Sequence, residues 1–405
     1  MREKGGFSSG GIPGRATSYG RLLGCDRSRD QEPGGKRSAS GGQPSEYARA
    51  AQIARPPTTT LPPFEPMTLK RILIPASLLG LFTIGAVALN QEEVGLLGAD
   101  DHIYRWDSSW GELKDGAVLG NTHGCIVSDS KGQIYVNTDT EKPMVIFSAE
   151  GDVVSTWGPE LAGGLHGTCI ATETTESGET REVLYLTHLG KHAALKTTLD
   201  GEILWEIPYP KESGHYENGN QYNPTSICVA ADGRFFVADG YGKSFVHRYD
   251  ADGKYLGSFG GYGTEPGQMR TPHGIWLDTR GEEPRLLVAD RENSRLQLFT
   301  LEGELLEVIQ GDLRRPCHAH QNGEYLLVAD LAGRITILDG ENKLVAHLGD
   351  QPDPNKRAKN GIPFEQWVDG EFLSPHCAHW DEKGDIYVMD WNARGRVTRL
   401  ERVTK

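Results

Sequence analysis

The chain has 405 residues, a formal net charge of −14 at pH 7 and 13 histidines. From residue 89 onward there are 30 basic and 50 acidic residues. This excess of acidic residues argues against nucleic acid or an anionic membrane surface as a partner.

Residues 1–66 differ in composition from the rest of the chain. They are rich in Gly, Ser, Arg and Pro and contain ten Lys/Arg and six Asp/Glu without an apolar period. Such a stretch buries too little apolar surface to offset its ordering entropy. We expect residues 1–66 to be disordered, or to be a mis-annotated upstream extension that is not part of the real protein, whose true start would then be Met67.

The stretch that begins at Met67 reads "MTLKRILIPASLLGLFTIGAVALNQEE". Lys70 and Arg71 precede an apolar run of 17 residues, and Ala86-Val87-Ala88 offers a cleavage site. This layout predicts a secretory signal peptide over 67–88 and an exported protein, periplasmic or extracellular. A membrane anchor is the alternative, because this length is at the low edge for a membrane span.

Six copies of a strand-turn-strand unit follow. Each opens on a short motif, continues with an apolar run and a Gly-containing turn, and ends a second run on a polar residue, usually Asp, as in "PRLLVADR" and "EYLLVADL". Four short β runs in each copy predict an all-β fold, a six-bladed β-propeller. The openers are Thr122-His123-Gly124, Leu165-His166-Gly167, Pro224-Thr225-Ser226, Pro272-His273-Gly274, Pro316-Cys317-His318 and Pro375-His376-Cys377.

The last repeat stops soon after its third strand, near Leu400. The segment "HIYRWDSSWGEL", 102–113, resembles a third-to-fourth-strand segment placed at the N-terminal end. We expect this N-terminal strand to close the ring by completing the last blade, which removes an exposed edge. Residues 97–405 are therefore predicted to form one propeller domain.

Five cysteines recur near the same place in the repeats. Because they recur in register, we expect them to be small buried residues that fill one layer of the fold. A disulfide framework is the less favoured alternative. They are Cys125, Cys169, Cys228, Cys317 and Cys377.

Histidines open several repeats. In a propeller the first strand of each blade lines the central channel, so His166, His273 and His376, on alternate blades, should converge on its axis. Three imidazoles with a fourth position left open are typical of catalytic zinc. The alternative is that each ring only hydrogen-bonds a neighbouring loop carbonyl. Whether His123 or His318 joins the site is left open by the sequence.

Specific stretches resemble known families. "GKSFVHRYDADGKYLGSFG" and "NSRLQLFTLEGELLEVI" resemble NHL repeats of six-bladed propellers. The region from "QYNPTSICVAADGRFFVADGYGK" to "LLVADRENSRLQLF" resembles peptidyl-α-hydroxyglycine α-amidating lyase (peptidylamidoglycolate lyase). That resemblance implies zinc bound by His166, His273 and His376, an active-site Tyr241, and Arg291 as a further active-site residue.

The implied reaction cleaves the N–C bond of an α-hydroxyglycine to give an amide and glyoxylate. Zinc would bind the substrate hydroxyl, and Tyr241 would serve as base; Arg291 could assist Tyr241 or hold a substrate carboxylate. The partner implied is a peptide or small-molecule substrate, with membrane contact only through the N-terminal segment.

Departures from the lyase pattern leave the substrate open. Cys377 replaces an aspartate that helps to hold a structural calcium, which makes Ca²⁺ doubtful, and no blade-1 arginine for the substrate carboxylate is found. A non-catalytic NHL propeller that binds a protein or glycan is the alternative, followed by a lactonase-type hydrolase. Two insertions, 208–223 with Tyr216 and Tyr222 and 350–372 with Phe364 and Trp367, could roof a pocket over the metal; the alternative is that they are variable surface loops.

Overall fold

The computed structural model describes residues 95–175 and 177–403, which lie within one compact unit, Val87–Lys405. The expectations for 1–66 and 67–88 concern residues outside this described part. No helix among the described residues is long and apolar enough to cross a membrane.

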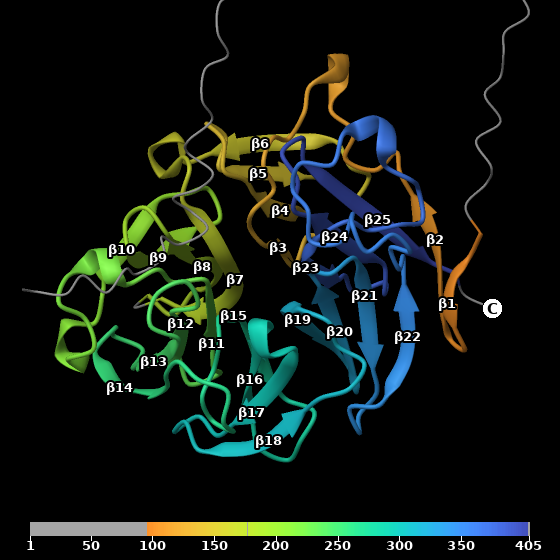
Figure 1. Cartoon of the computed structure of the whole chain (residues 1–405). Coiled ribbons are helices and arrows are strands. Elements are labelled where there is room, and N and C mark those ends of the chain that lie inside the picture. Colours follow the sequence, from red (N-terminus) through yellow and green to blue (C-terminus); the bar gives the residue numbers. More distant parts are fainter. Residues whose placement is uncertain (1–94, 176, 404–405) are drawn as a thin grey trace, which may run out of the picture. The chain divides into compact units, whose positions relative to one another are not determined.

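Six sheets surround a common centre (Figure 1). The fold is the predicted six-bladed β-propeller. Blade 1 contains β3 (Ile126–Ser128), β4 (Ile134–Asn137), β5 (Met144–Phe147) and β6 (Val153–Trp157). Blade 2 contains β7 (Leu165–Thr174), β8 (Thr180–His188), β9 (Ala193–Thr198) and β10 (Ile203–Pro208), and blade 3 contains β11 (Ser226–Val229), β12 (Phe235–Ala238), β13 (Phe245–Tyr249) and β14 (Tyr255–Gly260). Blade 4 contains β15 (Pro272–Asp278), β16 (Arg285–Asp290), β17 (Arg295–Phe299) and β18 (Leu305–Ile309), and blade 5 contains β19 (Pro316–Asn322), β20 (Tyr325–Asp330), β21 (Arg334–Leu338) and β22 (Leu344–Leu348).

The sixth blade joins both ends of the described chain. β25 (Arg396–Arg402) pairs with β2 (His102–Asp107), and β1 (Leu97–Ala99) adds a fifth strand outside β2; the inner strands are β23 (Pro375–Trp380) and β24 (Ile386–Asp390). An N-terminal strand therefore closes the ring, as predicted. The strand ends earlier than expected, because Trp110 turns inward to pack on Phe147 and Tyr387 between blades 6 and 1.

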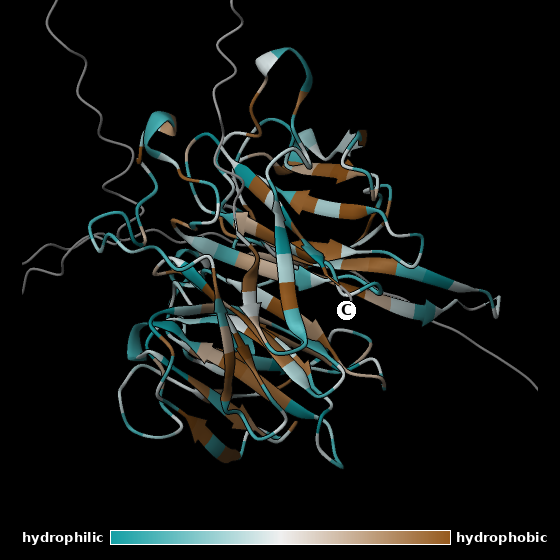
Figure 2. Cartoon of the chain, turned by 90° about the vertical axis from the view of Figure 1, so that its right-hand side faces the viewer, coloured by the Kyte–Doolittle hydropathy of each residue, from teal (hydrophilic) through white to brown (hydrophobic). Residues whose placement is uncertain are grey.

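The core lies between neighbouring blades. Leu287 and Ala289 of β16, for example, pack with Ala319 and Val328 of blade 5. The second strands are buried on both faces, which explains their near-continuous apolar runs. Figure 2 shows apolar residues concentrated in the strands and polar residues in the loops.

Each inner strand begins where the second strand of its blade ends. Pro272 pairs with Asp290, Pro316 with Asp330 and Pro375 with Asp390. The register shifts immediately after each proline. A β-bulge of this kind re-aims the extra residue, which is an opener residue: His273, Cys317 or His376.

The recurring aspartates are capping groups, as the repeat pattern suggests. Asp290 accepts a 2.7 Å hydrogen bond from the backbone N–H of Arg270, and Asp390 accepts one of 2.6 Å from that of Ser374. Both carboxylates are fully buried. They tie the chain before each inner strand to the end of the second strand, and so hold the opener residues in place.

All five cysteines of the described part are free thiols, and all except the half-buried Cys169 are buried. This agrees with the prediction of small buried residues at these positions.

Candidate metal centre and active site

The three predicted histidines meet at one end of the channel. Their ring centroids are 4.9 Å (His166 to His273), 5.0 Å (His166 to His376) and 4.7 Å (His273 to His376) apart. Three imidazoles on one tetrahedral zinc, with Zn–N of about 2.0 Å, have centroids about 5 Å apart. The spacing fits a single metal ion.

Each of these rings is held by a backbone carbonyl of the next blade around the ring. Nδ1 of His166 donates to Thr225 O at 2.6 Å, and Nδ1 of His273 donates to Cys317 O at 2.9 Å. Nδ1 of His376 donates to Gly124 O at 2.7 Å. These bonds fix the tautomer and leave the lone pair on Nε2, which is how the rings of histidine metal ligands are commonly oriented.

The opposite ring nitrogens are ready to bind. Nε2 of His166 and Nε2 of His376 are buried and have no hydrogen-bond partner within the described residues. Buried polar atoms are rarely left without a partner. Burial lowers the pKa of all three histidines well below the usual value, so the rings are neutral, the form that binds a metal. The residues present therefore fit a metal ion.

Glycines beside two of the histidines permit this convergence. A Cβ at Gly167 would lie 2.6 Å from Ser226 Cα, and a Cβ at Gly274 would lie 2.6 Å from Cys317 O. No side chain fits where one inner strand approaches the next blade so closely. The His-Gly pairs of the sequence thus have a packing reason.

His123 is a fourth member of the cluster. Its ring lies 4.8 Å from that of His166 and 4.9 Å from that of His376. Its Nδ1 is 3.5 Å from the Asp139 carboxylate, so it is held by a carboxylate where the other three are held by carbonyls. Two sets that include these histidines place their ligand atoms within 4.8 Å of one another: His123, His166 and His376 form one, and His273, Cys317 and His376 form the other.

Tyr241 and Arg291 lie at the same place. The Tyr241 hydroxyl is 3.0 Å from Nε2 of His273 and 3.2 Å from Nε2 of His123, and Nη1 of Arg291 donates to it at 3.2 Å. Arg291 directly follows Asp290, which ends β16, and Tyr241 lies in the turn that follows β12. That end of the blade also carries the start of the first strand, which is why these turns reach the histidines.

Arg291 is a buried cation. It is only 6% exposed, and its Nε donates to Glu292 Oε1 at 2.9 Å. Although burial opposes its charge, the neighbouring Tyr241 and Cys317 raise its pKa. Arg315 also pairs with Glu292, which anchors the Arg291 side chain from the far side.

Trp391 was missed by the sequence reasoning. Its ring lies 5.4 Å from that of His123. Trp391 follows Asp390 just as Arg291 follows Asp290, so its position in the repeat was the available signal.

The insertions do not place their tyrosines over the metal site. Tyr216 and Tyr222, in 208–223, are buried in the core between blades 2 and 3, and Tyr216 donates to Asp239 at 2.7 Å. The expectation that these two tyrosines roof the site is wrong, because their rings pack in the apolar core between blades 2 and 3. The other insertion does reach the histidine end, where Asn360 donates to Asn121 at 2.8 Å.

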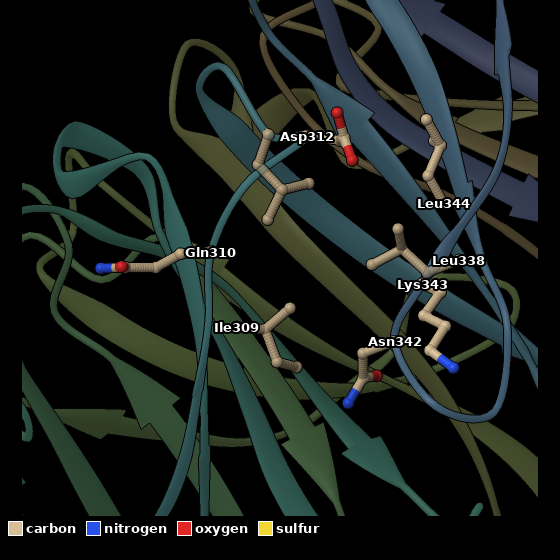
Figure 3. A pocket seen from close by; sticks show the side chains of 8 residues that line it. Ile309, Gln310, Asp312, Leu338, Asn342, Lys343 and Leu344 are labelled. Atoms are coloured by element: carbon tan, nitrogen blue, oxygen red, sulfur yellow. The ribbon is translucent and has the colours of Figure 1, made fainter.

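Two cavities differ in size and chemistry. A cavity of about 270 Å³ lies between the outer parts of blades 4 and 5 (Figure 3), away from the histidines. Its lining includes Ile309, Leu338 and Lys343 and offers no cluster of metal ligands. The other, of about 10 Å³, lies on the channel among His166, His273 and His376.

Curated proteins share parts of this sequence. The human NHL repeat-containing protein 3 is 26% identical over 257 residues, which cover 58% of this chain and 70% of that protein. Peptidyl-alpha-hydroxyglycine alpha-amidating lyase 2 of Drosophila melanogaster is 28% identical over 181 residues, 44% of this chain and 41% of that enzyme. The chain is thus similar to both. The resemblances read from the sequence are confirmed, although the match spans less than half of the fly enzyme.

No protein-family model matches the chain. Among solved structures, a streptogramin B lyase structure aligns with a TM-score of 0.49 and 12% identity, over 74% of this chain and 97% of that one.

Proposed function

We propose that the protein is an exported, metal-dependent lyase that cleaves the N–C bond of an α-hydroxyglycine to give an amide and glyoxylate. The observation that carries the proposal is the converging histidine set: the rings of His166, His273 and His376 lie 4.7–5.0 Å apart, with each Nδ1 fixed by a carbonyl. Propeller packing by itself does not need three buried, neutral imidazoles on one axis.

We assign the metal as zinc, which three histidines with an open fourth position commonly hold. When bound, it supplies Lewis acidity to the substrate hydroxyl and favours loss of that hydroxyl proton.

Tyr241 is the proposed proton carrier. Its hydroxyl is in contact with two histidines, and Arg291 donates to its oxygen. A charge-assisted hydrogen bond of this kind stabilises a phenolate, which accepts the proton of the substrate hydroxyl. As the carbonyl of glyoxylate forms, the C–N bond breaks and the amide nitrogen takes that proton. No net proton is gained or lost.

Arg291 fits a role at Tyr241 better than a role as carboxylate clamp. Its Nη1 already faces Tyr241 and its Nε faces Glu292. The groups that hold the substrate carboxylate are not assigned, so the acyl side of the substrate is left as a peptide or another small amide.

The direct test measures glyoxylate release from a peptidyl-α-hydroxyglycine by the purified, zinc-loaded full chain. Release that disappears after chelation and returns with zinc supports the proposal. Metal binding without release would show that the site serves another hydroxy compound, and lactone substrates should then be assayed. Absence of both metal and turnover would favour a propeller that only binds a protein or glycan.

Export rests on the apolar segment that follows Met67. Mass determination of the protein from a secreting host tests it. A mature N-terminus just after Ala88 supports cleavage, and an uncleaved chain in the membrane fraction supports anchoring.

A further inference from the structure

A second group of metal-ligating side chains lies next to the histidine cluster. It consists of Cys125, His318 and Cys377, whose ligand atoms all lie within 4.8 Å of one another. They come from blades 1, 5 and 6, and all three residues are buried. Cys377 directly follows His376, and Cys125 and Cys377 also border the apolar core between blades 6 and 1.

One ring nitrogen of His318 is buried without a hydrogen-bond partner among the described residues. The residue is 7% exposed, and the nitrogen is Nδ1. A buried imidazole nitrogen without a partner is costly unless something binds it.

The two sulfur atoms are close and are approached by a backbone donor. Sγ of Cys125 lies 2.7 Å from Sγ of Cys377, closer than the about 3.8 Å that two sulfurs keep on one tetrahedral zinc with Zn–S of about 2.3 Å, so the two side chains would move apart on binding an ion. The N–H of Ile126 donates to Sγ of Cys377 at 3.3 Å. Cysteine binds metals as the thiolate, so a bound cation would displace the thiol protons of this pair. The small channel cavity is lined by all three residues of this group as well as by the histidines.

We propose that Cys125, His318 and Cys377 form a second metal site, for a zinc-type thiophilic divalent cation. Two thiolates and an imidazole are a ligand set that zinc prefers, whereas calcium requires oxygen ligands. Two thiolate charges also offset the charge of a divalent ion, which lets it lie near the ion held by the histidines. This proposal does not depend on the lyase reaction.

Cobalt titration of the reduced full chain provides the test, because cobalt replaces zinc and thiolate ligation gives a near-ultraviolet charge-transfer band that histidine ligation lacks. The expected result is two cobalt ions per chain and a clear sulfur band. The Cys125→Ser/Cys377→Ser variant should lose the band and one ion. The His166→Ala/His273→Ala variant should lose one ion and keep the band.

Cys228→Ser is the matched control, because Cys228 is an equally buried inner-strand cysteine that packs in the core between blades 3 and 4. It should keep both ions and the band. Should the double-cysteine variant fail to fold, the wild-type band still decides. A wild-type chain without the band overturns the proposal, as does a single ion lost in both variants. A Cys125–Cys377 disulfide that forms in the presence of saturating metal overturns it too.

Discussion

The hydroxyl of Tyr241 lies 3.0 Å from Nε2 of His273, although the two residues belong to different blades. Tyr241 follows the second strand of blade 3, and His273 opens the first strand of blade 4. The contact joins the proposed proton carrier directly to the proposed metal ligand. The reaction centre is thus assembled between blades, and its geometry depends on how the blades pack.

Replacement of Tyr241 by Phe should lower kcat for glyoxylate release by about 10²- to 10⁴-fold, the usual contribution of a general acid–base group. Metal content should not change, because the hydroxyl is not among the proposed ligands. Steady-state kinetics on the zinc-loaded variant measures the effect. Tyr262→Phe is the control, since Tyr262 is 72% exposed; an equal loss in both variants would contradict the role of Tyr241.

Replacement of Gly274 by Ala should destabilise the fold by about 1–3 kcal/mol, as overpacking of a tight contact does. The added Cβ would press on Cys317 O, which is also the acceptor for His273 Nδ1. Metal affinity should therefore fall as well. Urea unfolding and metal titration measure the two effects. Gly361→Ala, with no atom within 4 Å of the added carbon, should leave both unchanged; unaltered metal affinity in Gly274→Ala would refute the coupling.

The dependence of stability on pH should carry a contribution from His247. Burial, with a smaller effect from His215, lowers the pKa of His247 to about 3. Below pH 6.5 this histidine binds a proton in the unfolded chain but stays neutral in the folded chain. The contribution of the neutral His247 to the free energy of unfolding is therefore lost as pH falls from 6.5 towards 3. Between pH 7.5 and pH 5 the loss is about 2 kcal/mol.

Urea unfolding of wild type and His247→Gln at several pH values measures this contribution. The variant should show a weaker loss of stability on acidification. Asp239, whose pKa burial raises to about 7, acts in the opposite sense, and comparison of the two proteins largely removes its effect. Ser258→Ala keeps the His247 ring and removes its 2.8 Å hydrogen bond, so it should retain the wild-type slope. Equal slopes for wild type and His247→Gln would be inconsistent with the argument.

The repeat pattern was enough to predict the fold and the ring closure. Strands such as "RLLVAD" of β16 are buried on both faces, so their apolar runs recur with the blades. The recurring position of His166, His273 and His376 likewise placed them at one end of the channel. Because every repeat forms one blade, residues at the same position in different repeats lie at the same level around the propeller axis.

The rest of the site depends on contacts that do not repeat. His123 joins the cluster through Asp139, a partner that no other opener has. Tyr216 sits in an insertion that could lie over the site, yet its ring fills a gap between blades and bonds to Asp239. Side chains in non-repeated loops are placed by local packing, which has no period in the sequence.

The central claim is that the histidine end of the channel holds a metal ion. The most direct measurement is the metal content of the purified full chain, saturated with zinc and freed of excess, beside the His166→Ala/His273→Ala/His376→Ala variant. His192→Ala is the control, because His192 Nδ1 makes a similar 2.6 Å bond to Tyr222 O outside the cluster. The account predicts that the triple variant binds one zinc fewer than wild type and His192→Ala. Equal zinc content in all three proteins would contradict it.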